Sequence, residues 1–391
     1  MAFTDYGTVT TSHTFNKTYY KGNFLKGQEQ YVVLDQFAKR QKDANIPINE
    51  GDTVKFSRVA PFAMKRTALT EGTNPNATKI YGNTVSATVE EYGDYVKPSK
   101  KYWLTNMDKD LAETSLEFGK AAAKTIDSLI WEAIAEGGMG LRADVDSTYM
   151  GETACADSCT TTSIILDALP TSITTAGTGV IVFLDGKNAG LTREFTYSDT
   201  NTVTVAALDN VPDDGDRVWV CATNGITSGD EVTAAHIQRA VAILDNNGCS
   251  PFDDGFYHAV YSAFQKYDFQ RDSEWTNLKH EAAPKDLYRN LEGEIYGAKF
   301  HKDNNPYRMA AGAIGTYSAT GAVHCISIFG KGAFGNVRLK GIDRKFYVNP
   351  PASQTENPLA MYGTIGWYDL CCPVVLDGRF IVNIFNKPSL I

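Results

Sequence analysis

The chain has 391 residues, enough for two or three domains of usual size and for a substantial buried core. Hydrophobic residues make up 43% and charged residues 21%, which is typical of globular proteins and excludes a disordered or fibrous chain. With 37 basic and 46 acidic side chains, the net charge of −9 disfavours tight, sequence-independent binding to nucleic acid.

No run of about 18 apolar residues occurs, and the first twenty residues lack the apolar core of a signal peptide. We therefore expect a protein that is made in the cytosol and stays there, with no membrane contact. The seven cysteines are not arranged as two CxxC pairs, so we interpret them as reduced thiols and expect no zinc site.

In chain order, a polar arm at 1–50 precedes a stretch at 51–102 that alternates apolar and polar residues around a turn-rich centre. This pattern predicts a long hairpin or extended loop. From 52 to 101 it carries eight basic and five acidic residues on an otherwise acidic chain, which suggests contact with an acidic neighbour. The candidate contact residues are Lys65, Arg66, Glu71, Lys97, Lys100 and Lys101.

One unbroken helix is predicted at 107–136, within a segment at 103–139, because apolar residues recur there at three-, four- and seven-residue spacings. Glycines at 137 and 138 follow, where a helix would end. About 30 residues make such a helix roughly 45 Å long, which suits a structural spine. The apolar stripe consists of Leu111, Phe118, Ala122, Ile126, Leu129 and Ala133.

The stretch from Arg142 to Ser228 holds 12 acidic and 4 basic residues, a net charge of −8. It is rich in threonine, and turn clusters separate five short strands, predicted at 162–166, 180–184, 192–197, 202–206 and 217–221. We interpret 140–229 as an inserted, independently folded acidic domain resembling a small β-sandwich.

The main fold is predicted to resume at 230–391. Thr233 can cap a helix with Ile237, Ala240, Val241 and Leu244 on one apolar face. The last third is rich in β-strand residues, with runs at 323–329, 344–349 and 372–385. Its final apolar run predicts a pair of strands joined by a tight turn.

Several motifs suggest chemistry but lack the residues it needs. Gly330, Gly332 and Gly335 form a GxGxxG string, yet no helical pattern follows, so a close-packed turn is favoured over nucleotide binding. His280 starts an HExxH-like string whose second histidine position is Pro284. The acidic runs at 213–216 and 253–255 lack calcium-loop spacing and read as turns. We therefore expect no catalytic residues, metal or cofactor, although an enzyme with an unfamiliar site remains an alternative.

Five strings resemble the major capsid proteins of N-four-like podoviruses, a tailed-bacteriophage family with the HK97-type fold. The similarity covers about 50–140 and 230–385, and does not include the acidic insertion. The strings are LTEGTNP (69–75), VEEYGDYV (89–96), LEGEIYGAKF (291–300), FGKGAFG (329–335) and GTIGW (363–367).

The resemblance implies an α+β, HK97-like capsid fold. In it, 1–50 is the N-terminal arm, 51–102 the extended loop (E-loop) that lies over a neighbouring subunit, 103–139 the spine helix of the peripheral domain, and 230–391 the axial domain with the closing strands of the peripheral domain. It implies a non-enzymatic protein that assembles with itself, as hexamers and pentamers, into the icosahedral shell of a virion. The shell would form in the host bacterial cytoplasm and enclose double-stranded DNA without sequence-specific binding. A portal, and scaffolding or cement proteins, would be further partners.

Two other functions remain as alternatives. An encapsulin-like compartment shell would have the same fold with a non-viral role. A cytosolic carbohydrate-binding protein would need exposed aromatic residues on the insertion, where Phe195, Tyr197 and Trp219 are the candidates. Core packing of these three side chains is the favoured interpretation.

Overall fold

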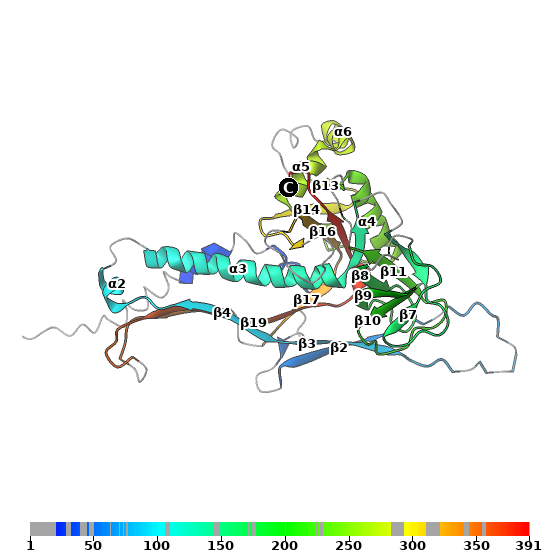
Figure 1. Cartoon of the computed structure of the whole chain (residues 1–391), viewed down its shortest axis with the longest axis horizontal. Helices are drawn as coiled ribbons and strands as arrows, with labels where there is room; N and C mark the ends of the chain where they lie inside the picture. Colours follow the sequence, from blue (N-terminus) through cyan, green and yellow to red (C-terminus); the bar gives the residue numbers. More distant parts are fainter. Residues whose placement is uncertain are drawn as a thin grey trace, which may run out of the picture.

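The chain forms an elongated molecule with one long helix lying along its long axis (Figure 1). Helices α4, α5 and α6 lie together above this axis, and a thin hairpin extends from the side opposite to α2. The computed structural model describes residues 21–28, 33–39, 45–46, 51–62, 64–69, 71–72, 74–75, 77–105, 110–143, 149–170, 173, 177–199, 201–223, 226, 230–282, 293–309, 321–339, 344–353 and 357–390.

Helix α3 (Asp110–Gly137) confirms the unbroken helix expected from the apolar spacing. Its buried face is wider than the predicted stripe, because Ile130, Trp131 and Ile134 are also fully buried. Leu129 is only half-buried, and the side chain of Leu111 lies outside the described part. The helix ends where the chain passes against a strand, since a Cβ on Gly138 would collide with Ile381 and Asn383.

A five-stranded sheet runs beneath α3, which packs on β19 (Figure 1). Phe118 and Ala122 of the helix meet Ile365 and Trp367 of the sheet in one apolar cluster. Short helix α2 (Lys100–Thr105) follows β4 at the far end. The strands are β1 (Asn45–Ile46), β4 (Glu90–Val96), β17 (Phe334–Leu339), β18 (Lys345–Asn349) and β19 (Thr364–Val375).

A seven-stranded sheet forms the centre of the molecule and is buried on both faces. This explains why its strands read as continuous apolar runs rather than alternating ones. The strands are β5 (Met139–Arg142), β12 (Tyr257–Ser262), β13 (Glu294–Ile295), β14 (Ala298–Asp303), β15 (Arg308–Met309), β16 (Val323–Phe329) and β20 (Ile381–Asn386).

Helices cover both faces of this central sheet. On one face lie α4 (Ala234–Asn246), α5 (Ala263–Arg271) and α6 (Ser273–Ala282), and on the other the C-terminal half of α3. Thr233 is the N-cap of α4, and the predicted apolar face of that helix is buried, as expected.

The final apolar run does not form the expected strand pair. β19 belongs to the five-stranded sheet, whereas β20 pairs with β16 and β5 in the central sheet. The short 3-10 helix η3 (Gly378–Phe380) carries the chain from one sheet to the other. Both strands are apolar, and apolar character alone does not select the partner strand.

The acidic stretch contains the five predicted strands and an additional one, arranged as one six-stranded sheet rather than two packed sheets. The edge strands approach each other through an isolated bridge between Cys155 and Leu166, so the sheet curls around its own apolar cluster. The strands are β6 (Met150–Ala154), β7 (Ser163–Ile165), β8 (Thr178–Phe183), β9 (Thr192–Asp199), β10 (Thr202–Val205) and β11 (Arg217–Ala222). We call 150–222 the β-module.

The β-module is not packed independently of the rest of the chain. Trp219 and Cys221 face the cluster that also holds Met139 and Leu141 of β5, and the Trp219 indole N–H donates to the Gly140 carbonyl at 2.8 Å. Alternate residues of β11, such as Val218, face the inside of the module. One strand therefore contributes side chains to two cores, so the β-module shares part of its packing with the rest of the chain.

The predicted hairpin is shorter than 51–102. Within the described part of the chain, strands β2 (Thr53–Val59) and β3 (Gly82–Thr88) pair only with each other, in a two-stranded sheet. After Val89 the chain continues as β4, which joins the five-stranded sheet by pairing with β19. Only the segment 53–88 is a hairpin, because β4 pairs with β19 in the five-stranded sheet instead of continuing the hairpin.

Much of the predicted N-terminal arm lies outside the described residues. Within the described part, 33–39 crosses the core: Leu34 is fully buried and Asp35 nearly so. Phe37 packs against His258, His301 and Phe329. Part of the predicted arm is thus a structural element of the folded chain.

Candidate assembly surface

The tip of the hairpin, residues 60–81, is exposed almost throughout its described part. Its large apolar side chains project into solvent, with 84% of Met64 and 73% of Ile80 exposed. Single exposed apolar residues are ordinary, but a group of them on one thin projection is typical of an interaction surface. The group comprises Val59, Phe62, Met64, Leu69 and Ile80.

The six candidate contact residues are all exposed, but they fall into two groups at opposite ends of the molecule. Lys65, Arg66 and Glu71 lie on the tip, beside the apolar residues. Lys97, Lys100 and Lys101 lie after β4 and at the start of α2, outside the hairpin to which they were assigned. The loss of hairpin pairing after Thr88 separates the two groups.

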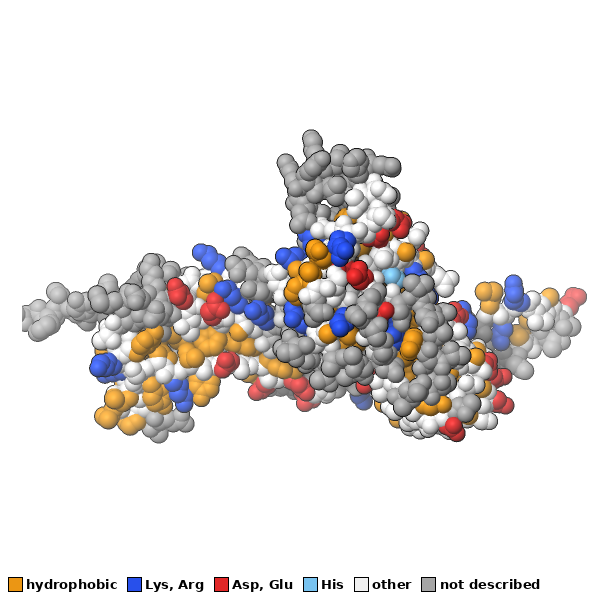
Figure 2. Space-filling model, turned by 45° about the horizontal axis from the view of Figure 1, so that its top comes forward, with side chains coloured by type: hydrophobic (Ala, Val, Ile, Leu, Met, Phe, Trp, Pro, Cys, Tyr) orange, Lys and Arg blue, Asp and Glu red, His pale blue; other side chains and the backbone are white. Residues whose placement is uncertain are grey.

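A second exposed apolar surface lies at the end opposite to the tip, where Figure 2 shows hydrophobic side chains gathered. A shallow trough of about 410 Å³ opens on the five-stranded sheet there, lined by Tyr95, Tyr347 and Tyr368 over the glycines 93 and 366. A Cβ at either glycine would collide with the neighbouring strand. The other exposed apolar residues at this end are Val96, Tyr102, Leu104, Leu359 and Met361.

The sequence analysis missed this far surface. Its tyrosines occur in segments where apolar and polar residues alternate, as they do in any half-buried strand. The sequence does not reveal which face of the sheet α3 covers. Because α3 packs against Ile365 and Trp367, the side chains of the alternate register, Tyr95 and Tyr347, remain uncovered on the other face.

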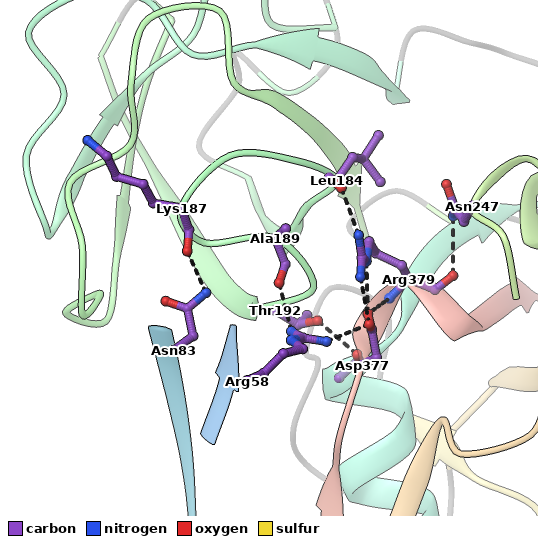
Figure 3. A network of polar contacts seen from close by, with 10 residues as sticks. Arg58, Asn83, Leu184, Lys187, Ala189, Thr192, Asn247, Asp377 and Arg379 are labelled. Atoms are coloured by element: carbon purple, nitrogen blue, oxygen red, sulfur yellow. Dashed lines mark hydrogen bonds and ion pairs between the residues drawn. The ribbon is translucent and has the colours of Figure 1, made fainter. Parts of the chain in front are cut away.

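The paired strands are bound to the β-module by polar contacts just before the tip begins (Figure 3). The Asn83 side-chain amide donates to the Lys187 carbonyl at 2.6 Å and accepts from the Asn210 amide at 2.9 Å. The Thr84 backbone N–H donates to the Asp209 carboxylate at 3.0 Å. Asn83 itself is only 1% exposed.

On the other strand of the hairpin, Arg58 reaches a junction with two other elements. Its guanidinium lies 2.5 Å from the Asp377 carboxylate and donates to the Ala189 carbonyl at 2.7 Å. Arg379 binds the same carboxylate at 2.8 Å and also donates to the Leu184 carbonyl at 3.1 Å. Burial lowers the pKa of Arg58, and the nearby Asp377 opposes that effect.

Gly190 is required at this junction. Its φ of +79° lies in the left-handed region that favours glycine, and a Cβ there would collide with the Arg58 guanidinium and the Asp377 carboxylate. The Gly190 carbonyl also accepts a hydrogen bond from the Gly378 N–H at 3.1 Å.

The glycine string at 330–335 forms a tight turn between β16 and β17, as expected, with Gly332 at φ +79°. A strand follows it instead of the helix that a dinucleotide site would need. The acidic runs at 213–216 and 253–255 are likewise turns, each with a glycine at positive φ. His280 lies in α6, and its side chain is outside the described part.

The three carbohydrate-contact candidates do not form a surface. Phe195 is 1% exposed inside the β-module, and Trp219 faces the central core. Tyr197 is half-buried against the core of the module. Phe195 fills the core of the module as expected, whereas Trp219 is buried in the central core rather than in the core of the module.

Among the residues that the structure describes, no group of three or more His, Cys, Asp and Glu side chains could hold a metal ion. No helix within the same described ranges is long and apolar enough to cross a membrane.

No protein-family model matches the chain, and no curated protein matches its sequence. Solved structures do match over about nine-tenths of their length. The capsid structure of the cyanophage P-SCSP1u has a TM-score of 0.51 and 16% identity, with 91% of each chain covered. The cyanophage Pam1 capsid asymmetric unit has a TM-score of 0.51 and 13% identity, covering 91% of this chain and 92% of that one. A structure from Mycobacterium phage Che8 has a TM-score of 0.51 and 11% identity over 90% of each chain. The chain therefore has the mixed α and β, HK97-like fold of phage capsid structures, as expected.

Proposed function

We propose that this chain is a major capsid protein that assembles with itself into the icosahedral shell of a tailed phage. The observation that carries the proposal is the likeness to phage capsid structures over about nine-tenths of the chain. The finer assignment, to the N-four-like podovirus family, rests on the five sequence strings given above.

The exposed surfaces support assembly by head-to-tail contacts. The apolar, basic tip and the tyrosine-lined far surface lie at opposite ends of one elongated chain. The tip of one copy can therefore contact the far surface only of another copy. Contacts between two different surfaces generate closed rings when the rotation between copies closes. Lys65 and Arg66 on the tip complement the tyrosine rings and the acidic Glu91 and Asp94 beside the trough.

The remaining assignments follow from the same proposal. The arm is 1–50, the E-loop corresponds to the hairpin at 53–88, α3 is the spine of the peripheral domain, and 230–391 supplies the axial domain and the closing strands. The net charge of −9 suits a wall that encloses DNA without binding it tightly. A portal, and scaffolding or cement proteins, would be partners during assembly in the bacterial cytoplasm.

The test of the proposal is reversal of the tip charges, with Lys65→Glu and Arg66→Glu introduced together. We expect no particles by negative-stain microscopy, whereas the parent chain forms uniform hollow shells. Unfolding of the subunit should change by less than about 0.5 kcal/mol, because both side chains are exposed.

The matched control is Arg239→Glu with Lys302→Glu, which reverses two exposed charges far from the hairpin in the sequence and should leave the particles normal. Normal particles from the tip variant would contradict the interface. Failure of the parent chain to form any particle would contradict the proposed function. Particles that carry enzymes rather than DNA in the native host would favour the encapsulin-like alternative.

A further inference from the structure

The hairpin needs support from outside itself. Two strands without further pairing are marginally stable in water, and among the described residues β2 and β3 pair only with each other. The lower part of the hairpin packs Ala87, with Val54, Phe56 and Val85 beside it, against Val337 and Val374 of the five-stranded sheet. Val85 also packs against the apolar core of the β-module. Above that cluster its described contacts with the rest of the chain include the polar ones to the β-module and to the turn at 377–379.

These polar contacts hold both strands of the hairpin at one level. Arg58 of β2 lies opposite Asn83 of β3 in the strand pairing. Arg58 is bound by Ala189 and Asp377, and Asn83 by Lys187 and Asn210. These contacts add a second level of attachment to the apolar cluster around Ala87, and two levels together oppose pivoting of the hairpin.

The supporting loop of the β-module is itself held in place. The Asn188 side chain is fully buried, and its amide donates to the Asn210 carbonyl at 2.8 Å, which joins the two loops that contact Asn83. Thr192 donates from its hydroxyl to the Gly137 carbonyl at 2.8 Å, which ties the same segment to the end of α3 (Figure 3). The loop that holds the hairpin is therefore itself bound to the neighbouring loop and to the end of α3.

We propose that the β-module is a bracket that sets the direction of the hairpin. Its loops at 186–190 and 209–210, together with Asp377 and Arg379, form what we call the root clamp around Arg58 and Asn83. This inference gives the β-module a role of its own within the subunit. Its consequence for assembly rests on the proposed function, since a misdirected hairpin would present its tip to the wrong place on the next copy.

The charge arrangement fits a role in geometry more than in stability. The side chains of Arg58 and Asp377 are 28% and 8% exposed, so both charges have lost part of their hydration. The attraction between the two charges must compensate for the free energy of that lost hydration. Such pairs contribute little net stability, and in some proteins they select one arrangement over others. Two arginines sharing one carboxylate fix the distance between β2 and the turn at 377–379.

The inference is tested by amide hydrogen exchange on the unassembled subunit, with Arg58→Gln and Asn83→Ala as separate variants. We expect amides of 53–59 and 82–88 to exchange at least tenfold faster, and amides of β16 and β20 to be unchanged. Lys55→Gln is the matched control, since it removes a positive charge from an exposed side chain of the same strand. Asn210→Ala removes the β-module's side of the contact with Asn83 and should give the same increase in exchange as Asn83→Ala.

Hairpin amides that exchange at the parent rate in Arg58→Gln and Asn83→Ala would overturn the inference, as would a uniform increase over the whole chain. Particle formation supplies a second measurement. We expect Arg58→Gln to give irregular particles and Lys55→Gln regular ones. Regular particles from Arg58→Gln would overturn the consequence for assembly. Hydrogen exchange is measured on the unassembled subunit. Its result therefore tests the role of the β-module independently of the proposed capsid function.

Discussion

Replacement of Ile130 by alanine should lower the free energy of unfolding of the subunit by about 2 to 5 kcal/mol. Ile130 is fully buried between α3 and the central sheet, in the cluster that contains Phe329, Ile381 and Phe385. The substitution removes buried methyl groups and leaves a cavity that a close-packed core fills only in part. Denaturant titration of the subunit measures the loss.

Leu129→Ala is the matched control, because Leu129 is adjacent in the sequence but only half-buried. Its loss should be clearly smaller than that of Ile130→Ala. Equal losses for the two variants would mean that the buried face of α3 has been assigned incorrectly. Particle yield should follow subunit stability in both variants, since neither side chain belongs to the proposed assembly surfaces.

The second large effect is a dependence of stability on pH that originates at Asp127. This aspartate lies on the buried face of α3 and accepts a hydrogen bond from the Val33 N–H at 2.8 Å. Burial raises its pKa to about 8, and the nearby carboxylates of Asp303 and Asp35 add to the effect. Asp127 therefore holds a proton at pH values at which an unfolded aspartate has released it.

The direction of the pH effect follows from that difference. Between about pH 4 and pH 8 Asp127 binds more protons in the native state than in the unfolded state, so its contribution to the free energy of unfolding falls as the pH rises. One pKa unit corresponds to about 1.4 kcal/mol, which sets an upper limit of about 6 kcal/mol for Asp127. Burial also raises the pKa of Glu136 to about 7, and that group acts in the same direction.

Asp127→Asn should flatten this profile and make the variant more stable than the parent at pH 8. The asparagine carbonyl can still accept the hydrogen bond from Val33, and no ionisable group remains at that position. Unfolding measured from pH 5 to pH 9 provides the test. Glu113→Gln, an exposed carboxylate on the same helix, should leave the slope unchanged. A parent-like slope in Asp127→Asn would show that Asp127 is ionised in the folded subunit.

The sequence by itself determined the elements whose signal is local. The 3.6-residue spacing of Phe118, Ala122 and Ile126 predicted α3 as one helix, because one face of a helix must be apolar to pack. The five strands of the β-module were predicted from their apolar runs and turn clusters, and the turn at 330–335 from its glycines. The HK97-like fold came from a resemblance in short strings rather than from these patterns.

Only the tertiary structure decided which elements are partners. Local pattern did not reveal that β19 and β20 enter different sheets, or that β4 leaves the hairpin for the edge of β19. Pairing depends on which edges and faces remain open after the rest of the chain has folded. The same reason explains why Trp219 serves the central core and why the tyrosines of the far surface remain exposed.

The candidate sites show the same division. Lys65 and Arg66 were found because charge and turn residues are visible in the sequence. The root clamp was not, because Arg58 and Asp377 are distant along the chain and each reads as an ordinary surface charge. Asp127 also reads as a solvated residue of a helix, and only the packing of 33–39 over it produces its burial. Long-range contacts of this kind depend on how distant segments pack against each other in the folded chain. The local sequence around each residue does not predict that packing.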